Sequence, residues 1–227
     1  MIGKNPEDMG KNTGRDLKIG WLTLGVCATN CYFIQGKDTQ GRDTQEVIFI
    51  DPADRGDYLY KKMQEKGFHI AAILLTHGHF DHIWGAEELR RLSGAQIYAS
   101  EEELGLLKDP EQNVSEDMGR SCALKPDILL KDREEMTLAG LHFQVILTPG
   151  HTSGSCCYYF PEENTLISGD TLFQGSVGRT DFPTGSSASI KQSVREKLMI
   201  LPPEVNVFPG HGEQTTIGYE KMYNPYA

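Results

Sequence analysis

An almost unbroken apolar run from Phe68 to Thr76 constrains the fold more than any other feature of this chain. A short apolar run between polar residues is typical of a strand that is buried on both faces of a sheet. The residues before it, Asp57 to Lys66, carry Leu59 and Met63 at helical spacing, which indicates a helix with one buried face. A helix that leads into a doubly buried strand is typical of parallel sheets covered by helices. We therefore predict an α/β fold.

Strand-like and helix-like segments alternate along the rest of the chain. The double proline Pro202–Pro203 ends the last expected helix before a final strand. Ser100 and Glu103 have the spacing of a capping box at the start of a short helix, whereas residues 108–130 show no clear period. We expect strands at residues 30–35, 46–50, 68–76, 95–99, 136–138, 141–148, 156–160, 165–168 and 205–208, and helices at residues 57–66, at 86–92 and around Ile190, Val194 and Leu198.

Length and charge limit the domain count and the partners. At about 150 residues per domain, a chain of 227 residues favours one large domain, which we expect to span residues 1–227 with a polar and irregular segment at 1–18. The net charge of -10 would repel a polyanion, so nucleic acid is not an expected partner.

The chain has no apolar run near the roughly 18 residues that a membrane-spanning helix needs. Residues 1–20 are polar where a signal peptide would be apolar, so we expect a cytoplasmic protein. The five cysteines include no C-x-x-C pair, and we expect them to be reduced, small apolar residues of the interior. They are Cys27, Cys31, Cys122, Cys156 and Cys157.

Four side chains of metal-ligand type lie directly after the apolar run. They are the two histidines, the aspartate and the last histidine of the motif H-x-H-x-D-H, namely His77, His79, Asp81 and His82. If the chain leaves the strand still extended, His77 and His79 project to the same side, and the turn into a following helix can bring the other two close. Neutral imidazole and carboxylate suit zinc and also manganese or iron. The motif therefore predicts a metal site.

Three further single residues, His151, Asp170 and His211, each follow an expected strand and lie beside a glycine. Together with the first four they provide five histidines and two aspartates, which is enough for two metals with one bridging carboxylate and an open position on each. The remaining histidines, His69 and His142, lie inside expected strands among apolar neighbours, and we interpret them as structural.

The order H-x-H-x-D-H, P-G-H-T, S-G-D-T-L-F and P-G-H-G, over roughly residues 30–211, resembles the metallo-β-lactamase superfamily. The segments N-C-Y, I-D-P at Asp51, G-D-T-L-F and G-R-T-D-F-P resemble its glyoxalase II-like branch, the hydroxyacylglutathione hydrolases, and particularly the short bacterial form without a C-terminal helical domain. This resemblance implies a four-layer αβ/βα sandwich of two mixed β-sheets flanked by helices, with metals at the shared strand edge.

The resemblance also implies roles for the site residues. A hydroxide that bridges two divalent ions would attack the carbonyl of a small thioester substrate, and Asp81 would orient it and pass its proton to the leaving group. Zinc is the expected metal, with iron or manganese as alternatives. The implied ligands are His77, His79 and His151 for one metal, Asp81, His82 and His211 for the other, and Asp170 as the bridge.

Some positions depart from the glyoxalase II pattern. Arg179 matches a basic residue of the family, but Asp181 and Glu213 stand where the family has tyrosines that contact glutathione. Only residues 212–227 follow His211, so the family's helical glutathione domain is not expected here. Arg179 either binds a substrate carboxylate through its planar guanidinium or pairs with Asp181.

Two other functions remain open. An iron-dependent persulfide dioxygenase of the same superfamily also carries G-R-T-D-F and would use one iron on His77, His151 and Asp170. The P-G-H-G ending and the proline of D-F-P favour the hydrolase. A metal-binding module without catalysis is the third reading, and the complete set of seven ligand-type residues argues against it.

Overall fold

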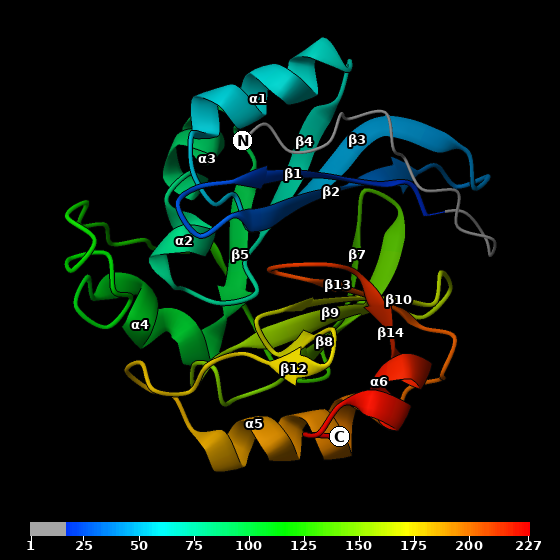
Figure 1. The fold of residues 1–227 in the computed structure, drawn as a ribbon. Coiled ribbons are helices and arrows are strands. Elements are labelled where there is room, and N and C mark those ends of the chain that lie inside the picture. Colours follow the sequence, from blue (N-terminus) through cyan, green and yellow to red (C-terminus); the bar gives the residue numbers. More distant parts are fainter. Residues whose placement is uncertain (1–16) are drawn as a thin grey trace.

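The computed structural model describes residues 17–227, so the polar segment expected at residues 1–18 lies outside the described part as far as residue 16. Two six-stranded sheets lie against each other, and helices cover the outer face of each (Figure 1). The four layers confirm the expected sandwich of two mixed sheets.

The first sheet has the strand order β1-β2-β3-β4-β5-β6. Its first three strands are antiparallel neighbours, and β3 to β6 run parallel. The predicted doubly buried strand lies inside this sheet, and its residues 72–74 are fully buried. The strands are β1 (Ile19–Leu24), β2 (Thr29–Lys37), β3 (Asp43–Ile50), β4 (His69–Leu74), β5 (Gln96–Ser100) and β6 (Ile128–Leu130).

The second sheet has the order β14-β13-β10-β9-β8-β7, and β10 and β13 are its parallel pair. A separate two-stranded ribbon is formed by β11 (Leu172–Phe173) and β12 (Ser176–Val177). The strands of the second sheet are β7 (Glu135–Leu138), β8 (Leu141–Leu147), β9 (Cys156–Phe160), β10 (Thr165–Gly169), β13 (Asn206–Pro209) and β14 (Thr215–Thr216).

The helices divide between the two outer faces. Leu59 and Met63 of α1 and Leu89 of α3 pack on the first sheet, as the helical spacing predicted. Val194 and Leu198, in the π-helical turn η2 (Val194–Leu198) that continues α5, pack on the second sheet. The helices are α1 (Gly56–Glu65), α2 (Phe80–Ile83), α3 (Ala86–Ser93), α4 (Leu104–Lys108), which follows the 3₁₀ turn η1 (Glu101–Glu103), α5 (Ser187–Ser193) and α6 (Ile217–Tyr223).

The core between the sheets joins side chains from both. Ile48 and Leu74 of the first sheet belong to the same buried cluster as Phe143, Tyr158 and Phe208 of the second. Because the residues of this cluster are buried, the two sheets cannot slide without losing apolar burial, at about 25 cal/mol per Å². The core therefore fixes the strand ends of one sheet relative to those of the other.

Several helices and strands were not predicted from the sequence. The strand at 205–208 is not the last one, because β14 and α6 follow it. The stretch 108–130 contains β6, which has three residues and pairs on one side only, with β5. β1 was also missed, since its burial does not alternate between the two faces. Short edge strands carry little periodic signal, which explains these failures.

Two expectations about single residues need correction, on Glu103 and on Cys27. The capping box is only half right: Ser100 caps a short helical turn by accepting from the N–H of Glu102, but the Glu103 carboxylate turns into the interior. Cys27 is exposed, whereas Cys31, Cys156 and Cys157 are buried as expected; all five cysteines are free. His69 and His142 lie in β4 and β8, and neither belongs to a group of metal-ligand type. Among the described residues, no helix combines the length and hydropathy needed to cross a bilayer.

The intersheet core provides a stability prediction. The Phe143 ring is fully buried and lies 5.2 Å from the ring of Phe160 and 5.7 Å from that of Tyr158. Phe143→Ala should lower the free energy of unfolding by about 3–5 kcal/mol through lost burial and a residual cavity. Urea unfolding checks this. The control Ile200→Ala, at a side chain that is 73% exposed, should change it by less than about 0.5 kcal/mol.

Candidate metal centre

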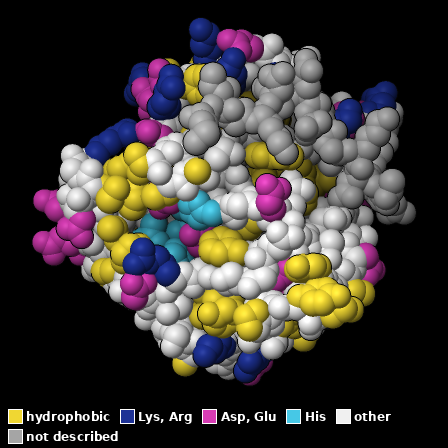
Figure 2. Space-filling view, viewed as in Figure 1, with side chains coloured by type: hydrophobic (Ala, Val, Ile, Leu, Met, Phe, Trp, Pro, Cys, Tyr) yellow, Lys and Arg dark blue, Asp and Glu magenta, His cyan; other side chains and the backbone are white. Residues whose placement is uncertain are grey.

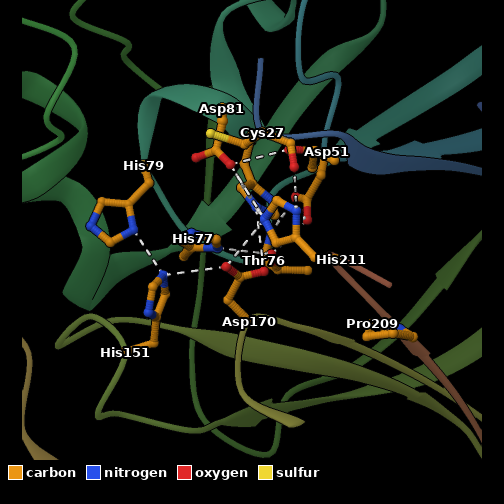
Figure 3. Close-up of polar contacts among 12 residues, drawn as sticks. Cys27, Asp51, Thr76, His77, His79, Asp81, His151, Asp170, Pro209 and His211 are labelled. Atoms are coloured by element: carbon orange, nitrogen blue, oxygen red, sulfur yellow. Dashed lines mark hydrogen bonds and ion pairs between the residues drawn. The ribbon is translucent and has the colours of Figure 1, made fainter. Parts of the chain in front are cut away.

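The seven predicted ligand residues meet where strands of both sheets end. His77 and His79 follow β4, His151 follows β8, Asp170 follows β10 and His211 follows β13. Because β10 and β13 are parallel neighbours, their carboxyl ends lie side by side. Figure 3 shows these side chains converging from both sheets. The structure therefore places every residue of the predicted ligand set in one cluster.

Close approach of the backbone explains one glycine of this site. A Cβ atom on Gly210 would collide with Asp170 and with the His82 ring. Any side chain at this position would displace these two side chains from the cluster. The glycine of P-G-H-G therefore leaves room for Asp170 and His82 beside His211.

The ligand atoms form three overlapping groups, and within each group they lie no more than 4.8 Å apart. In the first, His79 Nδ1 lies 2.8 Å from His151 Nε2. In the second, His211 Nε2 lies 3.3 Å from Asp81 Oδ2 and 3.4 Å from His82 Nε2. The three groups are His77, His79 and His151; Asp81, His82 and His211; and His77, His82 and Asp170.

Asp170 lies between the first two groups. Its Oδ2 is 3.6 Å from His151 Nε2 and 3.4 Å from His211 Nε2, and its Oδ1 is 3.4 Å from His82 Nε2. One carboxylate thus contacts rings from both groups. This is the position that a bridging ligand requires.

Unpaired polar atoms at the centre test whether a metal fits. His77 Nε2, His79 Nε2 and Asp170 Oδ1 are buried and have no hydrogen-bond partner. Leaving such an atom unpaired costs about 1–3 kcal/mol, so three in one place indicate a missing partner. Imidazole nitrogens with a few carboxylate oxygens are the donor set of zinc, iron and manganese sites. The residues present therefore fit metal ions.

The protonation states of four residues suit ligation. Burial lowers the pKa of His77 well below its usual value and that of His79 to about 3. Burial raises the pKa of the Asp81 and Asp170 carboxyls, but the charge of His82 and hydrogen bonding to His211 lower it by more. The net result is a pKa of about 2 for Asp81 and one well below the usual range for Asp170. Neutral imidazoles and ionised carboxylates are the forms that bind metals.

The pKa values of His82 and His211 are raised instead of lowered. Burial lowers their pKa values, but the carboxylates of Asp170 and Asp81 raise them more, to about 9 for His211. The cluster thus attracts positive charge to its centre. Protons on these two rings or metal cations can provide that charge.

A second layer of hydrogen bonds orients the rings. The Nδ1 atoms of His151 and His211 face the backbone carbonyls of Arg179 (2.7 Å) and Cys27 (3.1 Å), which leaves their Nε2 atoms turned to the centre. His82 Nδ1 lies 2.9 Å from Asp51 Oδ2. Asp51 also accepts hydrogen bonds from the backbone and side chain of Thr76. This carboxylate therefore links β3 to the start of the H-x-H-x-D-H loop.

The family assignment follows from this geometry together with sequence comparison. A model of the family described as "Metallo-beta-lactamase superfamily" matches residues 24–211. The chain belongs to this superfamily. The match includes all seven residues of the cluster.

Curated relatives cover most of the chain. The protein named "Probable metallo-hydrolase YqgX" from Bacillus subtilis is 35% identical, over 90% of this chain and 95% of its own length. The "Hydroxyacylglutathione hydrolase GloC" of Haemophilus influenzae is also 35% identical, over 81% of this chain and 88% of its own length.

Solved structures of the superfamily superpose closely. One titled "BLEG-1 B3 metallo-beta-lactamase" has a TM-score of 0.84 at 34% identity, and covers 92% of this chain and 98% of its own. Another, titled "TTHA1623 in a di-iron-bound form", has a TM-score of 0.79 at 34% identity, and covers 91% and 99%.

The mouth of this superfamily site is partly apolar. Figure 2 shows histidine side chains at the bottom of a hollow, with hydrophobic and basic side chains beside it. The ring of Phe182 lies 5.5 Å from that of His79, and the ring of Phe173 lies 6.1 Å from that of His211. Both phenylalanines are partly exposed. They lie in the motifs G-D-T-L-F and G-R-T-D-F-P, but no role was assigned to them from the sequence because a motif does not show which of its residues line the mouth.

Arg179 lies at the same mouth and pairs with Asp181. Its guanidinium donates to both carboxylate oxygens, at 2.8 and 2.7 Å, and lies 3.8 Å over the ring of Phe182. Arg179 was expected either to bind a substrate carboxylate or to pair with Asp181, and the structure shows the ion pair with Asp181. Both side chains are more than half exposed, so an anionic ligand can compete for the guanidinium.

Metal content provides the test of the cluster. Asp170→Ala should deplete both metal positions because this carboxylate contacts rings of both groups, whereas His211→Ala should deplete mainly one. Elemental analysis of purified protein, supported by anomalous diffraction, measures this. His142→Ala is the control, as a histidine outside the groups, and should keep the full content. Equal loss in the Asp170 and His211 variants would contradict the bridging position.

Proposed function

We propose that this chain is a metal-dependent hydrolase that cleaves small thioesters, as hydroxyacylglutathione hydrolases do. The observation that carries the proposal is that Asp170 contacts rings of both ligand groups, at the bottom of a partly apolar mouth. Such a centre hydrolyses an acyl group without a serine or cysteine nucleophile. The similarity to the Haemophilus influenzae protein named as a hydroxyacylglutathione hydrolase supports the choice of thioesters.

Metal ions held by the two groups would supply Lewis acidity for the substrate carbonyl and lower the pKa of a water molecule. We assign His77, His79 and His151 to one position and Asp81, His82 and His211 to the other. Asp170 would be the ligand shared by the two positions. Zinc is the metal we propose first, and the di-iron form of a relative keeps iron as an alternative.

Asp81 is the residue we propose for proton transfer. Its Oδ2 accepts a hydrogen bond from Thr29 at 3.1 Å and lies 3.3 Å from His211 Nε2, so the carboxylate has a fixed orientation. With a pKa of about 2 it is ionised at neutral pH. It can therefore accept the proton of an attacking water and pass it to the departing thiolate.

The mouth indicates which part of the substrate the chain recognises. Phe173 and Phe182 stand beside the two ends of the cluster and can pack against the hydrocarbon of an acyl or thiol group. Asp181 offsets the positive charge of Arg179 at the mouth, and the acidic Glu213 follows His211 by two residues. Uncharged or weakly charged thioesters are therefore the class we propose, ahead of glutathione conjugates.

Substrate assays test the proposal. Protein loaded with zinc or iron should hydrolyse S-lactoylglutathione and uncharged thioesters with kcat/KM values within about tenfold of one another, a difference of roughly 1.4 kcal/mol. Asp81→Asn should lower kcat by about 100-fold or more, with metal content measured in the same sample. A β-lactam belongs in the panel, because a related structure is titled a B3 metallo-β-lactamase.

Two results would overturn this assignment. Oxygen uptake with a persulfide, in protein that binds a single iron and cleaves no thioester, would establish the dioxygenase instead. Cleavage of the β-lactam alone would assign the centre to that substrate class.

Arg179 and Asp181 provide a prediction on substrate charge. Arg179→Ala should raise the KM of anionic thioesters by about two- to fivefold, the worth of an exposed ion pair, and leave neutral thioesters unchanged. Asp181→Asn should lower the KM of the same anionic substrates, since it removes the competing carboxylate. Steady-state kinetics on a matched pair of thioesters measures both. If the two variants change neutral and anionic substrates alike, Arg179 has only a structural role.

A further inference from the structure

Glu103 is a buried carboxylate that the proposed chemistry does not use. It ends the turn η1, and its residue is 1% exposed. None of the ion pairs found within residues 17–227 includes it. Burial raises the pKa of Glu103 to about 7, despite the opposing effect of its hydrogen bonds. A buried carboxyl without a cation is costly unless its hydrogen bonds compensate.

The carboxylate of Glu103 joins two segments that are far apart in sequence. Oε1 accepts a hydrogen bond from the backbone N–H of Gly78 at 2.8 Å. Oε2 accepts one from the hydroxyl of Thr152 and one from the backbone N–H of Gly154, both at 2.9 Å. These three donors belong to the loops after β4 and β8, which come from different sheets.

Both loops carry histidines of one ligand group. Gly78 stands between His77 and His79, and Thr152 directly follows His151. The separation of the two loops sets how far His151 lies from the other two rings. The carboxylate is thus a direct connection between the two halves of that group.

The surroundings leave the connection little freedom. A Cβ atom on Gly154 would collide with the backbone and the carboxylate of Glu103, and one on Gly78 would press on Leu106 and Leu107. Thr152 and Ser155 hold the second loop closed, because their hydroxyls lie 2.6 Å apart and Ser155 Oγ accepts from the Thr152 N–H. Both loops are therefore built for close contact with this side chain.

We propose that Glu103 is a positioning residue, which sets the spacing of His77 and His79 from His151 and so controls the affinity of that metal position. The inference rests on the metal-binding part of the proposed function. Asp81, His82 and His211 receive no contact from Glu103, so their position should respond little to its loss. A general role in stability would instead weaken both positions together.

Glu103→Gln is the main test. Glutamine keeps the size of the side chain, but its NH₂ group must face a donor, so at least one of the connections is lost. In metal-free protein titrated with zinc against a chelator, we expect one position to weaken by about tenfold or more and the other to change by less than about twofold. Anomalous diffraction from zinc-loaded crystals should show the depletion at His77, His79 and His151.

Two further variants keep the test decisive. Thr152→Val removes one of the three hydrogen bonds to Glu103, together with the contact between this hydroxyl and that of Ser155, and should weaken the same position by a smaller factor. Glu102→Gln, at the exposed neighbour of Glu103, should leave both affinities unchanged. The unfolding temperature of each metal-free variant measures any loss of stability separately.

The outcomes separate this inference from the proposed reaction. Equal weakening of both positions, or unchanged affinities with a lower unfolding temperature, would overturn the role of Glu103 while thioester cleavage by the wild type stands. A wild type that binds two metals and cleaves no thioester would remove the proposed substrate. The role of Glu103 would then still be decided by the titration.

Discussion

The structure depends on one constraint: five imidazoles and two carboxylates must lie together at the edge of an apolar core. Burial of such groups is unfavourable unless each polar atom finds a partner. The intersheet core fixes the strand ends in space, and hydrogen bonds from the surrounding loops fix the rings. Within the described part of the chain, three of the four buried side-chain atoms without a hydrogen-bond partner lie at the centre, on His77, His79 and Asp170, and the fourth is Oε2 of Glu163. Most of these unpaired atoms therefore lie where a cation would satisfy them.

The two sheets contribute differently to this centre. The first sheet supplies the H-x-H-x-D-H segment from one loop, so the spacing of its ligands is set locally by extended backbone leading into α2. The second sheet supplies one ligand from each of three strand ends, which are placed by strand pairing. Any link between the sheets near the centre therefore affects metal geometry. Asp51 and Glu103 are both carboxylates near this junction, and only the second joins loops of the two sheets.

The sequence predicted well which side chains of metal-ligand type lie together, because the segments that carry them follow strands whose apolar pattern is clear. His151, Asp170 and His211 could be grouped with the first motif only because parallel and sandwiched strands end at a common edge. The role of Glu103 was not predicted because a capping box concerns residues three positions apart, whereas the hydrogen-bond donors to Glu103 lie 25, 49 and 51 residues away. The elements β1, β6, β14 and α6 are short or lie at edges, where tertiary pairing and not periodicity decides the structure.

Burial differs between the two ligand groups, and this has a chemical consequence. His77, His79 and His151 are at most 3% exposed; in the second group His82 is fully buried, but the His211 side chain is 25% exposed and the Asp81 side chain 11%. A metal held by the first group would be enclosed by protein, and one held by the second would face the mouth. Solvent and substrate would therefore reach the second position first. Asp81, which we propose for proton transfer, lies on that open side, where a leaving thiolate can depart directly into solvent.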